Sequence, residues 1–281
     1  MKTIDQVEPV CPDCLGALEA GDWGHRCTRC GTRWPSQDGF PKFFREREVR
    51  ASDRFMRLFY NGLPALHDPL TTHFLPWLQR DTSEPVFRNA ALRELDLPGL
   101  CRQARGERLH VLEVGIGAGA NLPFIIDSLP PAARVTYWGL DLSRGMLGQC
   151  RKRLPCPPLD IRLMLGDAHS LPFADQMFDR VFHIGAIASY GQPELALREM
   201  GRVAKPGTPI VVVDEQLDGA RDNTLRDKLA FRLLTFYDRN PHCPTEKLPA
   251  TATDVRSVQL SRFLYCLKFS MPDQAPGAAR R

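Results

Sequence analysis

An apolar run that leads straight into a glycine-rich turn constrains this chain more than any other feature. Residues 109–114, LHVLEV, have the composition of a strand buried on both faces, and Gly115, Gly117 and Gly119 follow it directly. Helix-forming residues come next. Glycines at a strand-to-helix turn let the backbone lie against a ligand, and the helix N-terminus offers N–H groups to it. The pattern predicts a ligand site at a strand end in an α/β fold.

The turn alone does not choose between two classes of ligand. Gly115, Gly117 and Ala120 also fit the fingerprint of dinucleotide-binding proteins, and Asp141 stands where those proteins carry the acid that binds the ribose. Three further motifs favour the other class. They are Glu113 two residues before the first glycine, Gly166-Asp167-Ala168 after a strand pattern at 160–165, and the segment Glu199 to Gly207 before a strand pattern at 208–214.

The order of these motifs resembles that of class I S-adenosylmethionine-dependent methyltransferases, the broad family that includes the ubiquinone and menaquinone C-methyltransferases. The resemblance covers roughly residues 105–215. It implies a Rossmann-like α/β sandwich with a seven-stranded, mostly parallel sheet, in which segments 255–261 and 263–271 form the final antiparallel pair. It also implies S-adenosylmethionine as the cofactor and methyl transfer as the reaction.

The resemblance further implies a role for each motif residue. The glycines of the turn admit the methionine moiety and the ribose, Asp141 accepts hydrogen bonds from both ribose hydroxyls, and Asp167 accepts one from the adenine amine. His183 borders the sulfonium and is the candidate general base if the acceptor must lose a proton, with a purely structural role as the alternative. The predicted cofactor-binding residues are Glu113, Gly115, Gly117, Gly119, Asp141, Leu142, Asp167, Ala168 and His183.

Two CxxC pairs near the N-terminus predict a structural zinc site. Cys11 and Cys14 form the first pair, and Cys27 and Cys30 form the second. The spacing lets both sulfurs of a knuckle meet one ion, and four thiolates fill a tetrahedral Zn²⁺ site without leaving room for water. The competing interpretation, a redox CxxC, expects one pair beside a βαβ pattern.

The sequence around the cysteines resembles the zinc-ribbon family of tRNA-methyltransferase activators. Trp34-Pro35 and Asp38-Gly39-Phe40-Pro41 fall where that family has its aromatic-proline and glycine-proline positions. Similar ribbons occur fused to bacterial methyltransferases. The resemblance implies a ribbon that supports the fold or meets a protein or RNA partner.

We expect four segments along the chain. Residues 1–44 form the zinc ribbon, 45–105 a helical linker or lid, 106–272 the methyltransferase domain, and 273–281 a disordered tail. Phe55, Leu58, Phe59, Leu63 and Leu66 recur at helical spacing within the linker. Tyr60, His67 and His73 are candidates to line an acceptor pocket, with packing or surface exposure as the alternative.

Composition places the chain in the cytoplasm. The N-terminal MKTIDQVEPV has no apolar stretch typical of a signal peptide, and no apolar run reaches the length of a membrane span. Cytoplasmic thiols stay reduced, so nine cysteines favour metal ligation over a disulfide framework. A net charge of +4 is mild for a chain devoted to nucleic acid.

The methyl acceptor is less constrained than the cofactor. A small, partly apolar molecule is favoured, because the aromatic and apolar residues between 55 and 77 suit a lid over a hydrophobic acceptor. Residues 1–57 hold ten Lys/Arg against nine Asp/Glu and so give no extended phosphate track. The alternative is rRNA or tRNA base methylation with the ribbon recognising RNA. A non-catalytic binding or activator protein fits the ribbon but not the intact cofactor motifs.

Overall fold

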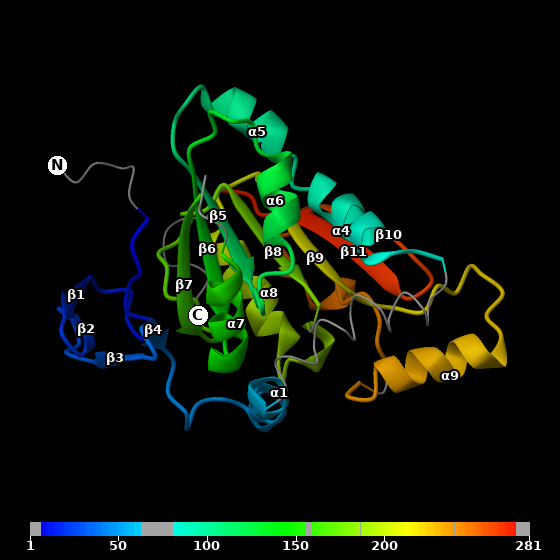
Figure 1. The fold of residues 1–281 in the computed structure, drawn as a ribbon, viewed down its shortest axis with the longest axis horizontal. Coiled ribbons are helices and arrows are strands. Elements are labelled where there is room, and N and C mark those ends of the chain that lie inside the picture. The colour runs from blue at the N-terminus through cyan, green and yellow to red at the C-terminus, as the bar shows by residue number, and fades with distance from the viewer. Residues whose placement is uncertain (1–6, 63–80, 155–158, 186, 239, 274–281) are drawn as a thin grey trace.

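The glycine-rich turn lies at the carboxyl end of a central strand in a long twisted sheet (Figure 1). The structure is a computed structural model that describes residues 7–62, 81–154, 159–185, 187–238 and 240–273. The strands are β1 Leu18–Gly21, β2 Gly24–Cys27, β3 Arg33–Gln37, β4 Phe40–Phe43, β5 Leu109–Val114, β6 Val135–Asp141, β7 Asp160–Gly166, β8 Arg180–Ile184, β9 Ile210–Glu215, β10 Thr253–Gln259 and β11 Leu264–Ser270.

The sheet has 11 strands in the order β1-β2-β3-β4-β7-β6-β5-β8-β9-β11-β10. The prediction of a seven-stranded sheet is therefore wrong for the sheet as a whole. The last seven strands of this order are those expected of the catalytic fold, and the N-terminal segment adds the other four. The two groups of strands form one sheet because β4 pairs in parallel with β7, with Lys42 opposite Leu165 and Phe43 opposite Gly166. Cysteine spacing carries no information about this pairing.

Within the seven strands β5 to β11, the expected mostly parallel arrangement is present. Strands β5 to β9 run parallel, with β5 between β6 and β8. β11 is antiparallel to both β9 and β10, which confirms the predicted final pair. Because parallel strands end at the same edge of a sheet, the loops after β5 to β9 gather there, and the strand order reverses beside β5.

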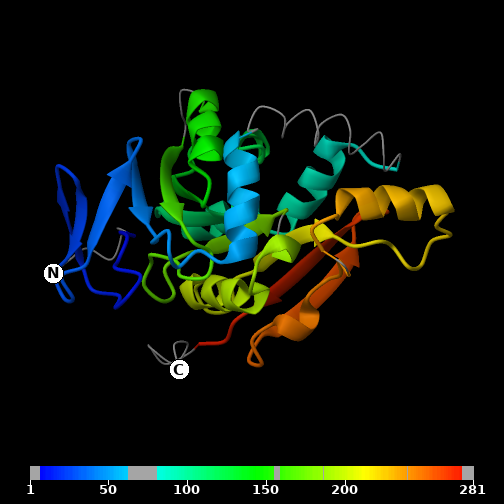
Figure 2. The ribbon, with the colours of Figure 1, turned by 90° about the horizontal axis from the view of Figure 1, so that it is seen from below.

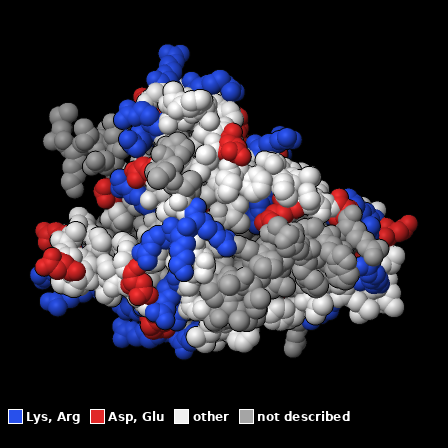
Figure 3. Space-filling view, in the orientation of Figure 1, with Lys and Arg blue, Asp and Glu red and all other residues white. Residues whose placement is uncertain are grey.

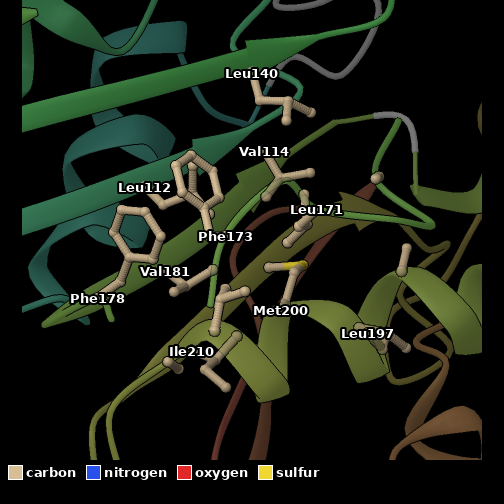
Figure 4. Packing of buried hydrophobic residues seen from close by; sticks show 14 of the residues in the cluster. Leu112, Val114, Leu140, Leu171, Phe173, Phe178, Val181, Leu197, Met200 and Ile210 are labelled. Atoms are coloured by element: carbon tan, nitrogen blue, oxygen red, sulfur yellow. The ribbon is translucent and has the colours of Figure 1, made fainter. Parts of the chain in front are cut away.

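Helices cover both faces of the catalytic sheet (Figure 2). They are α1 Ala51–Gly62, α4 Glu84–Arg93, α5 Leu97–Ala104, α6 Leu122–Ser128, α7 Arg144–Arg153, α8 Pro193–Val203 and α9 Leu225–Leu234, with short 3-10 turns at Ile187–Ser189 and Thr245–Lys247. All six residues of β5 are buried, as its composition predicts. Leu112 and Val114 pack against Met200 of α8 (Figure 4), whereas Leu109 and Val111 belong to the core under α4, α6 and α7.

The cysteine-rich segment shares its core and its surface contacts with the catalytic sheet. Trp34 and Phe43 lie in the same buried cluster as Trp138 of β6. Basic side chains gather over α7 (Figure 3), and two of them face this segment. Arg144 forms a 3.2 Å ion pair with Asp38, and Arg151 donates to the Asp38 carbonyl oxygen. The segment is therefore packed onto the catalytic sheet, which compensates for its small size.

The described part of the linker contains the helices α1, α4 and α5, joined by turns. Phe55 and Leu58 lie on α1, as their spacing predicts. His67, His73 and residues 274–281 lie outside the described residues, as does the side chain of Tyr60. Among the described residues, no helix combines the length and apolar character needed to cross a membrane. The boundaries between the four segments stay predictions.

Candidate functional site

A cavity of about 520 Å³ lies at the edge where the parallel strands β5 to β9 end. Its wall comes from the loops after these strands, from α1 and α4, and from the end of α9. Seven predicted cofactor-binding residues line it, namely Glu113, Gly115, Gly117, Asp141, Leu142, Asp167 and Ala168. Gly119 and His183, the two others, lie behind this wall. The structure thus brings together residues that are up to 55 positions apart in the sequence, from Glu113 to Ala168.

The glycines after β5 are needed for two different reasons. Gly115 and Gly117 have positive φ angles of 72° and 55°, and both contribute backbone to the cavity wall. Gly119 also has a positive φ, but a Cβ there would lie 2.8 Å from the Cys150 sulfur on α7. Its role is therefore close packing of the turn against the helix, which differs from the predicted direct contact with the cofactor.

Asp141 is held at the end of β6 by two backbone donors. The N–H of Gly117 donates to Oδ2 at 2.8 Å, and the N–H of Ser143 donates to Oδ1 at 2.7 Å. Burial raises the pKa of Asp141 to about 6, so the carboxylate is ionised at neutral pH. Each oxygen keeps a further lone pair, which makes the group a fixed double acceptor at the cavity wall.

Asp167 is oriented by a histidine two residues further along. Its Oδ1 accepts from the His169 backbone N–H at 2.9 Å and lies 2.6 Å from the His169 Nδ1. Burial alone would raise the pKa of Asp167, but the hydrogen bonds and charge of His169 outweigh it and lower the pKa below its usual value. Asp167 is therefore an ionised acceptor beside the Ala168 backbone.

Glu113 lies beneath the glycine turn in a buried polar chain. Its carboxylate accepts hydrogen bonds from Tyr137 and from the Asn121 side chain, and Asn121 in turn accepts from Arg88 of α4. Burial raises the pKa of Glu113 to about 7. The chain ties β5, β6 and α4 together under the turn and fixes the floor of the cavity.

His183 is fully buried behind the turn. Its Nδ1 lies 2.7 Å from the Val114 carbonyl oxygen, and its ring packs on Tyr190 with a centroid distance of 5.3 Å. Burial lowers the pKa of His183, which makes the ring neutral and Nδ1–H the donor to Val114. Within the described part of the chain, its Nε2 has no hydrogen-bond partner. The side chain supports the cavity wall from behind, and its catalytic role stays a prediction.

Sequence motifs miss the acidic group at the end of β9. Glu215 lines the cavity, and the Tyr237 hydroxyl donates to its Oε2 at 2.8 Å. Burial and the neighbouring Asp214 raise the pKa of Glu215 well above its usual range. An acid at the end of a parallel strand, the signal that identifies Asp141, is present here too. The position of Glu215 at a strand end could therefore have identified it as a candidate. Its partner Tyr237 lies 22 residues away, and no sequence motif connects the two residues.

Helices α1 and α4, which precede the glycine turn in the sequence, contribute charged side chains to the cavity that no sequence motif predicts. Asp53 and Arg57 of α1 and Arg88 of α4 line the cavity. Asp53 accepts a 3.1 Å hydrogen bond from the Gly191 backbone, and burial raises its pKa. Six carboxyl side chains line the cavity against two arginines and one histidine.

The four cysteines of the two CxxC pairs converge on one point. Their sulfurs all lie within 4.8 Å of one another, with Cys11–Cys30 at 3.7 Å and Cys14–Cys27 at 3.5 Å. Sulfurs bound at the usual length to one tetrahedral zinc would be about 3.8 Å apart, so this spacing fits the ion. The backbone N–H groups of residues 29 and 30 donate to the Cys27 sulfur, and the Trp34 indole donates to Cys11. Such donors stabilise metal-bound thiolates.

Comparison with known proteins supports the catalytic part of the chain. Residues 112–212 match the family described as a methyltransferase domain. A fatty-acid O-methyltransferase of Mycolicibacterium smegmatis is 36% identical over 112 residues, which are 40% of this chain and 39% of that protein. A phosphatidylethanolamine N-methyltransferase of Cereibacter sphaeroides is 36% identical over 115 residues, 40% of this chain and 52% of that protein. The chain thus spans about two fifths to one half of these relatives.

A solved structure extends the likeness of fold beyond the matched region. The [4+2]-cyclase SpnF superposes with a TM-score of 0.57 over 80% of this chain and 98% of its own, at 14% identity. That likeness shows the fold alone. Together, the motif order, the cavity and the family match support a methyltransferase domain over residues 112–212 that uses S-adenosylmethionine. The match begins at residue 112, so only the cysteine cluster supports the zinc ribbon.

We predict that Asp141→Asn weakens S-adenosylmethionine binding by about 1–3 kcal/mol, because hydrogen bonds to a charged acceptor are lost. In the unsubstituted protein, affinity should fall as the pH falls through about 6, where Asp141 gains a proton, and the variant should lack this step. Titration calorimetry measures both effects. Asp160→Asn, at the exposed start of β7, is the control and should leave the affinity unchanged. Equal or tighter binding of NAD would contradict the assignment.

Proposed function

We propose that this protein is an S-adenosylmethionine-dependent methyltransferase that methylates a small, partly apolar, lipid-like acceptor. The cavity at the strand ends carries the proposal, because it combines the cofactor motifs with apolar side chains from α1, α4 and the end of α9. The relatives named for a fatty acid and for phosphatidylethanolamine support the lipid-like class. The family match supports the reaction.

The motif residues would hold the cofactor at the β5–β7 end of the cavity. Asp141 would accept hydrogen bonds from the ribose hydroxyls, Asp167 would accept one from the adenine amine, and the bare backbone at Gly115 and Gly117 leaves space for the methionine moiety. When bound, S-adenosylmethionine supplies a methyl group on a strongly electrophilic sulfonium. The task left to the protein is to orient the acceptor in line with that methyl group and to exclude water.

The β9 end of the cavity has the character of an acceptor site. Its wall is mostly apolar, with a small number of polar groups that can fix orientation, which is the usual form of a site for a small molecule. The apolar lining residues on the elements near β9 are Leu233, Phe236 and Leu264. Glu215 and Tyr237 are the polar pair among them.

Glu215 is placed to take the proton that an oxygen or nitrogen acceptor releases. The Glu215 carboxylate would accept the proton of the acceptor atom as that atom takes the methyl group from S-adenosylmethionine, which would leave as S-adenosylhomocysteine. Burial and the neighbouring Asp214 raise the pKa of Glu215, so its carboxylate is a stronger base than an exposed one. The Tyr237 hydroxyl orients the carboxyl group. We therefore assign this role to Glu215 in preference to the buried His183.

We also propose that Cys11, Cys14, Cys27 and Cys30 bind one structural Zn²⁺. The sulfur spacing and the N–H donors around Cys27 support this ion. Four protein ligands would leave no open position, so the metal would stabilise the segment and take no part in the chemistry.

The proposed function is tested with radiolabelled S-adenosylmethionine, the full chain and two acceptor pools. Label should enter the organic-soluble fraction of a bacterial lipid extract, and Asp141→Asn should reduce it at a cofactor concentration below saturation. Ribosomal RNA is the second pool and should remain unlabelled. Transfer to RNA alone, with affinity that falls steeply as salt rises, would replace the lipid-like acceptor by an RNA base.

We predict that Glu215→Gln lowers kcat roughly 10²–10⁴-fold while the affinity for S-adenosylmethionine stays the same. The rate of the unsubstituted enzyme should rise with pH as Glu215 loses its proton, at a pH above the usual carboxyl range because the pKa is raised. This limb of the pH profile should vanish in the variant. Glu246→Gln, an exposed acid outside the cavity, is the matched control. An unchanged profile in Glu215→Gln would refute the assignment.

We predict one zinc per chain by elemental analysis. Cys27→Ser should release it and lower Tm by roughly 10 °C or more, since about 1 kcal/mol shifts Tm by 2–4 °C in a protein of this size. Because the ribbon strands continue the catalytic sheet, unfolding should remain a single transition. Cys101→Ser, on α5 and outside the cluster, should keep the zinc. Metal-free protein, or two disulfides in reduced preparations, would contradict the site.

A further inference from the structure

Helix α9 has apolar residues on two opposite faces, and only one of them is covered. Ala230 and Phe231 are buried, and the Phe231 ring packs on Phe263 with a centroid distance of 5.3 Å. The outer face is exposed to solvent. It carries Leu225, 75% exposed, Leu229 and Leu233, each 63% exposed, and Phe236 just past the helix, 56% exposed.

The exposed residues form a continuous stripe. At 100° per residue, Leu225, Leu229 and Leu233 fall within an arc of about 80° on the helix surface. Single exposed apolar residues are ordinary on a protein surface, but a contiguous row marks a site of interaction. Figure 1 shows α9 at the periphery of the molecule, away from the central strands of the sheet.

The charges beside the stripe are positive. Arg226, Lys228 and Arg232 are exposed and flank the leucines on both sides. The one carboxylate of the helix, Asp227, caps its N-terminus through Thr224 and forms a 3.3 Å ion pair with Arg262. The outer face is therefore apolar along its centre and cationic along its margins, which is the pattern of a helix that lies in the headgroup region of a membrane.

The stripe continues into the cavity. Leu233 and Phe236 are exposed to solvent and also line the acceptor end, beside Tyr237 and close to Glu215. A lipid-like acceptor that leaves a bilayer under α9 would thus pass along apolar side chains to the reacting groups. This link to the site distinguishes α9 from the other exposed apolar positions, such as Val258 on β10.

We propose that α9 is an interfacial helix that docks the enzyme on an anionic lipid surface and delivers the acceptor to the cavity. The inference rests on the proposed lipid-like acceptor. The leucines would enter the acyl boundary, and the flanking cations would meet anionic headgroups. A second copy of the chain fits the stripe less well than a lipid surface. In a symmetric dimer through this face, the cationic margins of the two helices, which carry Arg226 and Arg232, would lie close together, and their like charges would repel.

The test is co-sedimentation of the full chain with vesicles of pure phosphatidylcholine and with vesicles of equal parts phosphatidylcholine and phosphatidylglycerol. We expect binding to the anionic vesicles and weaker binding as salt rises. The double variant Leu225→Asn/Leu229→Asn should bind about tenfold less tightly or worse. Reversal of charge by Lys228→Glu should weaken binding roughly fivefold. Val258→Asn, at a similarly exposed position away from the helix, should bind as the unsubstituted protein does.

Neither Leu225 nor Leu229 lines the cavity, so the double variant separates docking from catalysis. It should keep its affinity for S-adenosylmethionine and its rate on detergent-dispersed lipid, and lose rate only on lipid in vesicles. Equal binding to both vesicle types, or equal binding by the double variant and the unsubstituted protein, would overturn the inference. Methyl transfer to dispersed lipid would still uphold the proposed function in that case. A dimer that the double variant dissociates, with no vesicle binding, would show that a second copy covers the stripe. Vesicle binding without any methyl transfer would uphold docking and refute the function.

Discussion

Two backbone hydrogen bonds hold the site together. The N–H groups of Gly115 and Ile116 donate to the Leu140 carbonyl oxygen at 2.7 and 3.1 Å, and so fasten the turn after β5 to the end of β6. With the turn in that place, the Gly117 N–H reaches Asp141. Positive φ angles at the glycines make this path possible. The conformation of the turn after β5 therefore determines the shape of the cavity, the position of the acceptor oxygens and the packing against α7.

The pairing of β4 with β7 gives the N-terminal segment its place in the enzyme. β7 ends at Gly166, next to Asp167, and Phe43 of β4 stands opposite that glycine. The same segment leads into α1, whose Asn61 side chain accepts from the backbone of Gly145 and lies 2.8 Å from the Ser143 hydroxyl, near Asp141. The four-cysteine cluster is thus connected to Asp141 and Asp167, the two acids proposed to bind the cofactor, through one sheet and one helix.

Local motifs predicted the catalytic core well, because strand, turn and acid follow each other within a few residues. Gly117, Asp141 and Asp167 lie where the motif order indicates. What failed depends on contacts between distant segments. The pairing of β4 with β7 and the meeting of Glu215 with Tyr237 arise from tertiary packing that no spacing encodes. The position of His183 at a strand end carried the prediction of a catalytic role, and its complete burial could not be read from that position alone. That role stays a prediction.

Folded proteins can associate non-specifically through the edges of their sheets, because the unpaired N–H and C=O groups of an edge strand can form hydrogen bonds with a strand of another molecule. In this fold β4 pairs with the last two residues of β7, Leu165 and Gly166, and so covers the carboxyl end of an edge that would otherwise be open. If the proposed zinc stabilises the whole chain, it also affects solubility. Without the metal a larger fraction of chains would be unfolded, and β7 in those chains would be open to pairing with other molecules.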